Sequence, residues 1–245
     1  MKTKNIFSVL TAIVLLTSTI CAQEESTGNF FLGLSGGVSA PLGNFASTDL
    51  GEFGSWNNTS GFAKTGFNIG FDGAYYFHKN IGVGGVLNFS DHGGLTKDDA
   101  TKLGDSYTDA FGVDESTVIT NSRYRTLNFL VGPYFSLPFN KFSIEARALG
   151  GLAQSISTPE VSVQLEDNPA FTQLSSTASA FGWQLGLGFK YSFSEKMALS
   201  LMCDYFSTPG VAISNENRSN TAGRLVTNQQ MSWINGSLGL AYKLK

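Results

Sequence analysis

The segment FNIGFDGAYYFHKNIGVGGVLNF, residues 67–89, decides the fold class of this chain. Large apolar side chains alternate in it with small or polar ones at a period of two residues, which is the period of a β-strand. The short turn at residues 78–80 separates two such runs, so the segment predicts a β-hairpin. One face of the first run carries Phe67, Ile69, Phe71, Gly73, Tyr75 and Phe77.

The same hairpin design recurs further along the chain. Short turns at residues 139–141 and 194–196 each separate two alternating runs, and one more run lies near each end of the sequence. Gly132-Pro133 interrupts one run, where the missing N–H of proline predicts a bulge. The eight expected strands cover residues 30–40, 67–77, 81–90, 129–137, 142–152, 181–193, 197–205 and 231–244.

The connections between these strands alternate between short and long. Short turns face one rim, whereas the other rim receives the long polar stretches at about 41–61, 91–122, 157–178 and 207–229. An even number of strands of about ten residues, with short turns on one side and long loops on the other, is typical of outer-membrane barrels. We therefore expect an all-β fold, an eight-stranded antiparallel up-and-down transmembrane β-barrel.

The two faces of the strands indicate which side meets lipid. A soluble lipocalin-like barrel would place its apolar residues inside. Here the second face is mainly Gly, Ser, Ala and Asn, which suits the narrow interior of an eight-stranded barrel, so the large Phe and Leu side chains point outward. Aromatic residues beside the short turns are expected to form an interfacial girdle, namely Tyr75, Phe77, Phe139, Phe142, Tyr191, Phe193 and Tyr242.

Isolated charges on the inward face predict a network inside the lumen. An unpaired buried charge is costly, so opposite charges should pair across the narrow interior, and we expect Arg147 to compensate Glu145. The predicted lumen network consists of Asp72, Glu145, Arg147, Lys190, Asp204 and Lys243.

The composition excludes several classes of protein. Charged residues make up 14% of the chain, below the roughly 25% of an average soluble domain. The net charge of -3 argues against a nucleic-acid partner. With 2 His and 2 Cys there is little material for a metal site or a disulfide, and no cofactor is expected.

The N-terminus predicts export. Lys2 and Lys4 precede an apolar stretch too short to span a bilayer, so residues 1–22 are expected to be a signal peptide and residues 23–245 the mature barrel domain. A lipid anchor on Cys21 is the alternative, but Ile20 stands where lipoprotein signals have a small side chain.

The chain resembles the small outer-membrane barrels of OmpA and OmpX type, and more closely the outer membrane β-barrel proteins of Bacteroidetes-like bacteria. The resemblance rests on the leader ending Cys21-Ala22-Gln23, on the repeated hairpins, and on the terminal segment 237–244. It implies a location in the cell outer membrane and recognition by the assembly machinery through the C-terminal strand. The segment departs from the family signal in ending with Leu244 and Lys245.

Three groups of residues could carry chemistry. Gly82, Gly84 and Gly85 suggest a phosphate loop but lie within a strand, so close packing is favoured. The acids between Asp98 and Glu115 could bind Ca²⁺, although a solvated loop is the favoured interpretation. Ser90, Asp91 and His92 would suit an enzyme, but strand neighbours point to opposite faces, and we expect His92 in an exposed loop.

The sequence therefore predicts a monomeric, non-enzymatic barrel with a structural or surface-interaction role. A small porin or transport protein and an outer-membrane lipid-modifying enzyme are the alternatives. Acids outnumber bases in the long connections, so the outer face should be acidic. The expected partners are outer-membrane lipid and lipopolysaccharide, together with basic surface ligands.

Overall fold

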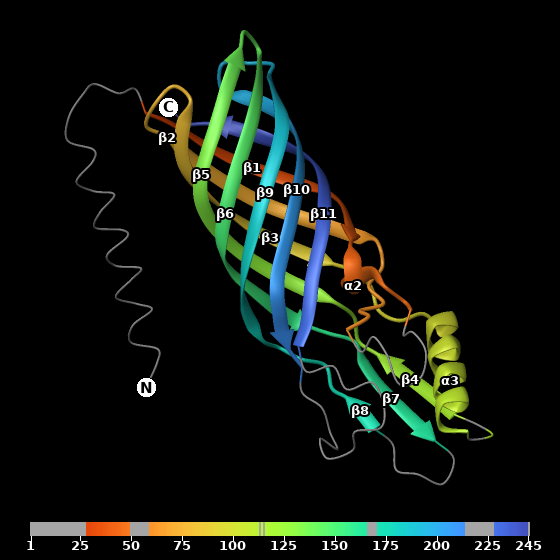
Figure 1. Ribbon diagram of the computed structural model, residues 1–245. Coiled ribbons are helices and arrows are strands. Elements are labelled where there is room, and N and C mark those ends of the chain that lie inside the picture. The colour runs from red at the N-terminus through yellow and green to blue at the C-terminus, as the bar shows by residue number, and fades with distance from the viewer. Residues whose placement is uncertain are drawn as a thin grey trace, which may run out of the picture.

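The computed structural model describes residues 28–49, 59–112, 114, 116–165, 171–213 and 228–244. Eight antiparallel strands close into a barrel in the order β1-β11-β10-β9-β6-β5-β3-β2, so the predicted fold class is confirmed (Figure 1). These strands are β1 (Asn29–Pro41), β2 (Gly66–Tyr76), β3 (Ile81–Asp91), β5 (Arg125–Phe139), β6 (Phe142–Ser157), β9 (Ser179–Ser192), β10 (Met197–Ala212) and β11 (Asn228–Lys243).

Every barrel strand alternates between an apolar outer face and an inner face. The outer side chains are exposed although they are large and apolar, as Phe67, Ile69 and Phe71 on β2 illustrate. Such a continuous apolar wall requires a bilayer, and closure of the barrel pairs the backbone groups that lipid could not satisfy. Most of the expected girdle residues are exposed beside the short turns: Phe139 and Phe142 are exposed there, and Phe142 lies 4.8 Å from Tyr191 between ring centroids.

The strands extend beyond the expected limits at the rim with long connections. β5 begins at Arg125, before the expected start at Phe129, and β10 continues to Ala212. The expected bulge at Gly132-Pro133 is wrong, because the register between β5 and β6 is the same on both sides of that pair. The register shifts occur instead at Arg125/Thr126 and at Thr208/Val211.

A small folded module stands beyond this rim, at the end of the barrel opposite the C-terminus (Figure 1). It consists of the helix α3 (Lys97–Phe111) and a sheet formed by β4 (Ser116–Asn121), β7 (Glu160–Leu165) and β8 (Phe171–Gln173). The prediction of solvated loops is therefore wrong for α3, β4, β7 and β8, which lie within the connections at 91–122 and 157–178. A second, short helix, α2 (Gly43–Ala46), follows β1.

Local chemistry explains why α3 forms. Thr96 and Asp99 make a capping box, in which each side chain accepts a hydrogen bond from the other residue's backbone N–H. Leu103 and Tyr107 stand one helical turn apart and are buried against the β7 side chains Val161 and Val163. Gly112 ends the helix in the left-handed conformation, with φ 60.

Neither helix in the described segments has the length and apolar character needed to cross a membrane. The leader, residues 1–22, lies outside the described residues. The same holds for the loop charges Glu52, Glu115, Glu166, Asp167, Glu216, Arg218 and Arg224.

Candidate functional site

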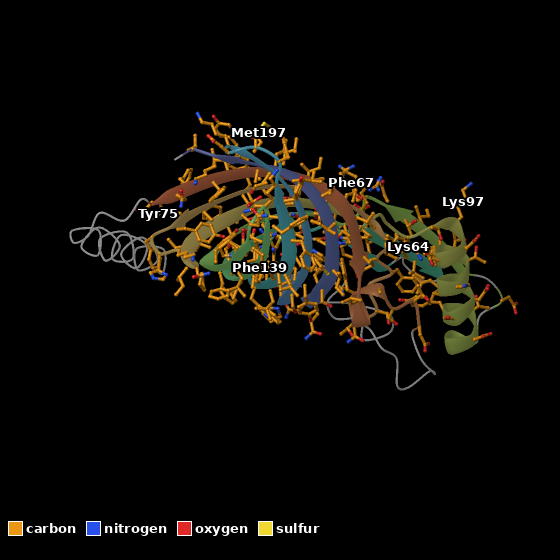
Figure 2. All side chains as sticks on the ribbon, turned by 90° about the horizontal axis from the view of Figure 1, so that it is seen from above. Lys64, Phe67, Tyr75, Lys97, Phe139 and Met197 are labelled. Atoms are coloured by element: carbon orange, nitrogen blue, oxygen red, sulfur yellow. The ribbon has the colours of Figure 1, made fainter. Side chains whose placement is uncertain are left out.

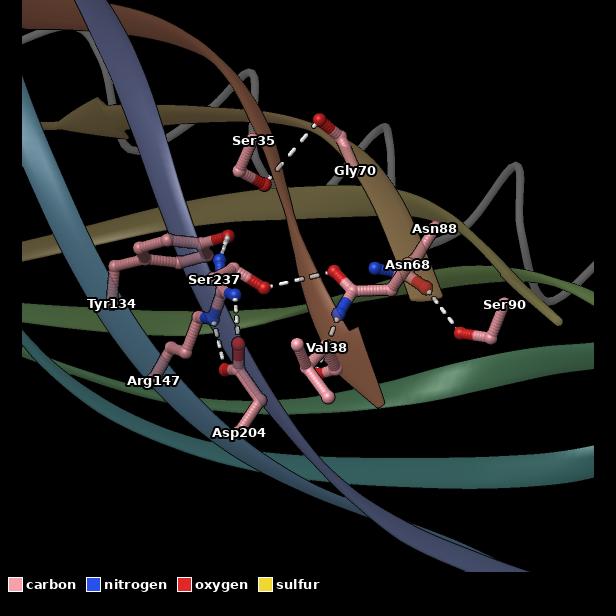
Figure 3. Close-up of polar contacts among 10 residues, drawn as sticks. All are labelled: Ser35, Val38, Asn68, Gly70, Asn88, Ser90, Tyr134, Arg147, Asp204 and Ser237. Atoms are coloured by element: carbon pink, nitrogen blue, oxygen red, sulfur yellow. Dashed lines mark hydrogen bonds and ion pairs between the residues drawn. The ribbon is translucent and has the colours of Figure 1, made fainter. Parts of the chain in front are cut away.

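The barrel interior is built around a two-point ion pair between Arg147 on β6 and Asp204 on β10 (Figure 3). Arg147 Nε lies 2.8 Å from Asp204 Oδ1, and Nη2 lies 2.7 Å from Oδ2. Tyr134 adds a longer contact, since its hydroxyl accepts from Arg147 Nη1 at 3.4 Å. Both charged side chains are buried, where either charge without a partner would strongly destabilise the fold. The ion pair compensates both charges.

A second ion pair joins Glu145 to Lys190 on β9, with Nζ 2.9 Å from Oε1. Ser136 and Tyr76 also donate to the Glu145 carboxylate, at 3.3 and 3.4 Å. Lys190 lies over the ring of Phe31, 4.7 Å from its centroid. The expected compensation of Glu145 by Arg147 is therefore wrong. Lys190 compensates the Glu145 charge instead, because Arg147 pairs with Asp204.

The other two predicted charges do not join an ion pair with the described residues. Asp72 points inward against Gly33, and together with Arg147 and Lys190 it lines a cavity of about 20 Å³. Lys243 is half-buried near the end of β11. A cavity of this size has room for about one water molecule.

A layer of neutral polar side chains lies further toward the long connections (Figure 3). Ser237 donates to Asn68 Oδ1 at 2.8 Å, and the Asn68 amide donates to the carbonyl of Val38 at 3.1 Å. Ser90 donates to Asn88 at 2.8 Å. The first two bonds link β1, β2 and β11, and the bond between Ser90 and Asn88 lies within β3, the neighbour of β2 in the barrel.

An aromatic cluster fills the mouth of the barrel above this layer. Phe45 of α2 enters it from the rim, with centroid distances of 4.9 Å to Tyr124 and 6.0 Å to Trp233. Phe206 stacks on Trp233 at 4.2 Å. We call Phe45, His92, Tyr124, Phe206 and Trp233 the aromatic cap. The expectation of a mainly small interior missed it, although Phe206 and Trp233 already stood in the inward phase of their strands.

His92 is fully buried in the aromatic cap, so the expected exposed position is wrong. Its Nε2 and the hydroxyl of Ser39 are 2.7 Å apart, while Nδ1 has no partner among the described residues. Burial lowers the pKa of His92 to about 4, against a weaker opposite effect of the Asp91 charge. Ser39 is also fully buried. His92 therefore pairs with a buried Ser39. The structure does not join it to Ser90, which donates to Asn88, and Asp91 accepts from Arg125.

Within the described segments, no three His, Cys, Asp or Glu side chains come together in the way a metal ion requires. What the geometry defines is a membrane-spanning barrel of the outer-membrane type, with charges and aromatic rings packed inside. Residues 12–230 match the family described as "Outer membrane protein beta-barrel domain", and the chain belongs to that family. This places the protein in the outer membrane.

Several solved structures of outer-membrane proteins are similar to this chain over most of its length. Neisserial surface protein A is 11% identical, with a TM-score of 0.46, and the match covers 88% of this chain and 97% of that one. OprG from Pseudomonas aeruginosa is 14% identical, with a TM-score of 0.45 and coverages of 89% and 97%. Ail of Yersinia pestis is 12% identical, with a TM-score of 0.40 and coverages of 89% and 97%. No curated protein sequence matches the chain.

Proposed function

We propose that this protein is a non-conducting barrel that holds a small folded module at the cell surface, and that the module makes the contacts with other molecules. The observation that carries the proposal is the packing of α3 on the sheet β4-β7-β8 beyond the rim (Figure 1). A folded unit of this kind presents its side chains in fixed positions, which favours specific binding.

The interior supports a structural role over transport. The two ion pairs, the polar layer and the aromatic cap succeed one another along the lumen, and the cavity beside Arg147 measures about 20 Å³. Ion conduction needs a continuous water path, which a packed interior of this kind does not offer. The small porin alternative would require the aromatic cap and the ion-pair layer to move together.

The same burial argues against a lipid-modifying enzyme. A serine nucleophile needs an adjacent base and access to its substrate. Ser39 has a base in His92, but both side chains are fully buried, and Phe45 and Trp233 pack against the His92 ring. A catalytic role is therefore not part of the proposal.

The charge of α3 indicates the kind of partner. Asp98, Asp105 and Asp109 belong to the side of the helix that does not pack on the sheet, whereas Leu103 and Tyr107 are buried on the other side. An acidic surface attracts basic ligands, and the attraction weakens as salt rises. We infer that a basic peptide or protein segment binds this side of the module.

Two measurements test the proposal. In planar bilayers the purified protein should give no steady current, and stepwise channel openings would contradict the closed barrel. In binding assays a lysine-rich peptide should bind the protein in the presence of EDTA, which removes bridging cations. The variant Asp98→Asn/Asp105→Asn/Asp109→Asn should weaken this binding about tenfold, and Lys97→Gln/Lys102→Gln should not weaken it. Equal binding by the acidic-site variant and the natural protein would contradict the role of the module.

A further inference from the structure

A row of outward-facing positions crosses three strands at the outer rim of the barrel. Phe67 on β2 pairs with Asp91 on β3, and Asp91 pairs with Arg125 on β5. Asp91 continues the outward phase of Leu87 and Phe89, yet it is buried. A carboxylate on the outward face at the end of a lipid-facing strand needs cationic partners, because an unpaired buried charge is costly. Arg123 and Arg125 are those partners.

Arg123 and Arg125 bind the same carboxylate. Arg123 places Nε at 3.0 Å and Nη2 at 2.7 Å from Asp91 Oδ1, and Arg125 Nε lies 3.1 Å from Oδ2. The Gly93 backbone N–H donates to Oδ1 at 2.9 Å. One carboxylate thus faces two guanidinium groups, which leaves one positive charge in excess and guanidinium N–H donors that it does not engage.

The cations of this cluster are exposed and the acid is not. The side chains of Arg123 and Arg125 are 49% and 46% exposed, against 4% for Asp91. The backbone holds the arginines in place, because His92 N–H donates to the Tyr124 carbonyl at 2.9 Å and the Ser157 hydroxyl donates to the Arg123 carbonyl at 2.6 Å. A molecule approaching from outside therefore meets guanidinium groups.

Lys64 repeats this arrangement beside the pair. Its Nζ lies 2.8 Å from Asp99 Oδ2, and the side chains are 36% and 7% exposed. The Lys64 backbone N–H donates to the His92 carbonyl at 2.7 Å, which places it next to the Asp91 end of β3. Figure 2 shows Lys64 at the end of the barrel that faces α3. Burial opposes ionisation of Asp99, but the hydrogen bonds from Lys64 and Thr96 hold its pKa below the usual value.

The wall directly below the cluster is apolar. The next outward row joins Ile69, Phe89 and Leu127, and it lies roughly 7 Å further along the strands, because two residues of a strand rise that far. The rings of Phe67 and Phe89 are 6.0 Å apart. The long connections of an outer-membrane barrel face the outside of the cell, so this is the level where outer-leaflet headgroups give way to acyl chains.

We propose that Arg123, Arg125 and Lys64 form a binding site for a phosphate group of an outer-leaflet lipopolysaccharide, whose acyl chains lie on the wall formed by the row below. Guanidinium groups bind phosphate oxygens through paired N–H donors, and an exposed cation cluster directly above an apolar wall fits a lipid that carries its phosphate at the headgroup. The site lies at the outer rim of the barrel, and it does not include the acidic residues Asp98, Asp105 and Asp109 of α3.

The experiment compares lipids that differ only in phosphate. The protein is placed in phosphatidylcholine nanodiscs that contain lipid A or dephosphorylated lipid A, with EDTA present, and native mass spectrometry counts the glycolipid retained. Retention of the phosphorylated lipid should be about tenfold stronger. Inorganic phosphate at the same concentration should not displace it, and full displacement would overturn the assignment to a lipid.

The test variant is Asp91→Asn/Arg123→Gln/Arg125→Gln, which removes the acid together with both arginines and so leaves no unpaired charge at the rim. It should migrate as a folded barrel and lose the preference for phosphate about tenfold. The exposed Lys141→Gln, at the opposite rim, should keep the preference. Unchanged preference in the triple variant, or an equal loss in Lys141→Gln, would overturn the site. If the triple variant does not fold, Arg125→Gln alone carries the same test, with the same outcomes.

Discussion

Arg147 and Asp204 form their ion pair directly over Gly186. In the strand register Gly186 on β9 is the partner of Arg147 on one side and of Asp204 on the other. A Cβ at position 186 would lie 2.1 Å from Asp204 Oδ1 and 2.8 Å from Arg147 Cγ. The missing side chain of one strand therefore lets two charged residues of its neighbours meet across it.

Gly186→Ala should destabilise the barrel on the order of 3 kcal/mol, because the added methyl group separates a buried ion pair. Unfolding by urea in lipid vesicles, followed by tryptophan fluorescence, measures the free energy. Gly236→Ala is the matched control, since a Cβ there meets nothing within 4 Å. Equal stability of the two variants would show that the ion pair is not held in this way.

Arg147→Gln should cost about 3 to 5 kcal/mol, because it leaves the Asp204 carboxylate buried without its cation. Arg147→Gln/Asp204→Asn should recover a large part of this loss, and the double-mutant cycle gives the coupling between the two residues. If neither variant loses stability, the lumen is wet and the porin alternative gains support.

The stability of the barrel should fall between about pH 6.5 and pH 4 because of His92. Its pKa is lowered to about 4 by burial, so over this range the unfolded chain takes up a proton that the folded chain does not. The loss should reach about 3 kcal/mol and level off below pH 4, where the folded form is also protonated. Urea unfolding at several pH values measures it. His92→Gln should flatten this part of the curve, and a variant of the exposed turn residue, His78→Gln, should not.

Leu103→Ala should loosen the module formed by α3 and the sheet β4-β7-β8 without opening the barrel. Leu103 is buried between α3 and the sheet, where a loss of this size costs about 2 to 5 kcal/mol of local packing. Limited proteolysis should cut the connection around α3 faster, while the gel shift between unheated and boiled samples stays the same. Lys102→Ala, at an exposed neighbouring position, should leave proteolysis unchanged. Loss of the gel shift in Leu103→Ala would mean that the module is required for barrel assembly.

The mature protein should begin at Gln23. The leader prediction rests on Lys2, Lys4 and the apolar stretch that follows them. Mass spectrometry of the protein from the membrane fraction measures the N-terminus, and a lipid attached to Cys21 would replace cleavage after Ala22 by a lipoprotein anchor.

The sequence by itself determined that the strands form a barrel, which face of each strand points outward, and which charged residues point into the lumen. These features follow from the two-residue period of a β-strand. Successive side chains point to opposite faces, so the face of each residue can be predicted from its own strand alone. The alternation of short and long connections then counts the strands and separates the two rims. The membership of Asp72, Glu145, Arg147, Lys190 and Asp204 in the lumen could be predicted for the same reason.

Only the tertiary structure decided which of these charges meet. Pairing across a barrel depends on the stagger between strands and on gaps such as Gly186, so Arg147 reaches Asp204 two strands away, and Glu145 is left to Lys190. The tertiary structure also decided the positions of α3 and of His92, which both lie at the rim with the long connections. α3 gains its stability by packing on β7, and His92 is buried because Phe45 and Trp233 from distant segments close over it. A residue's face is a local property of its strand, whereas its partner depends on how the strands are joined in space.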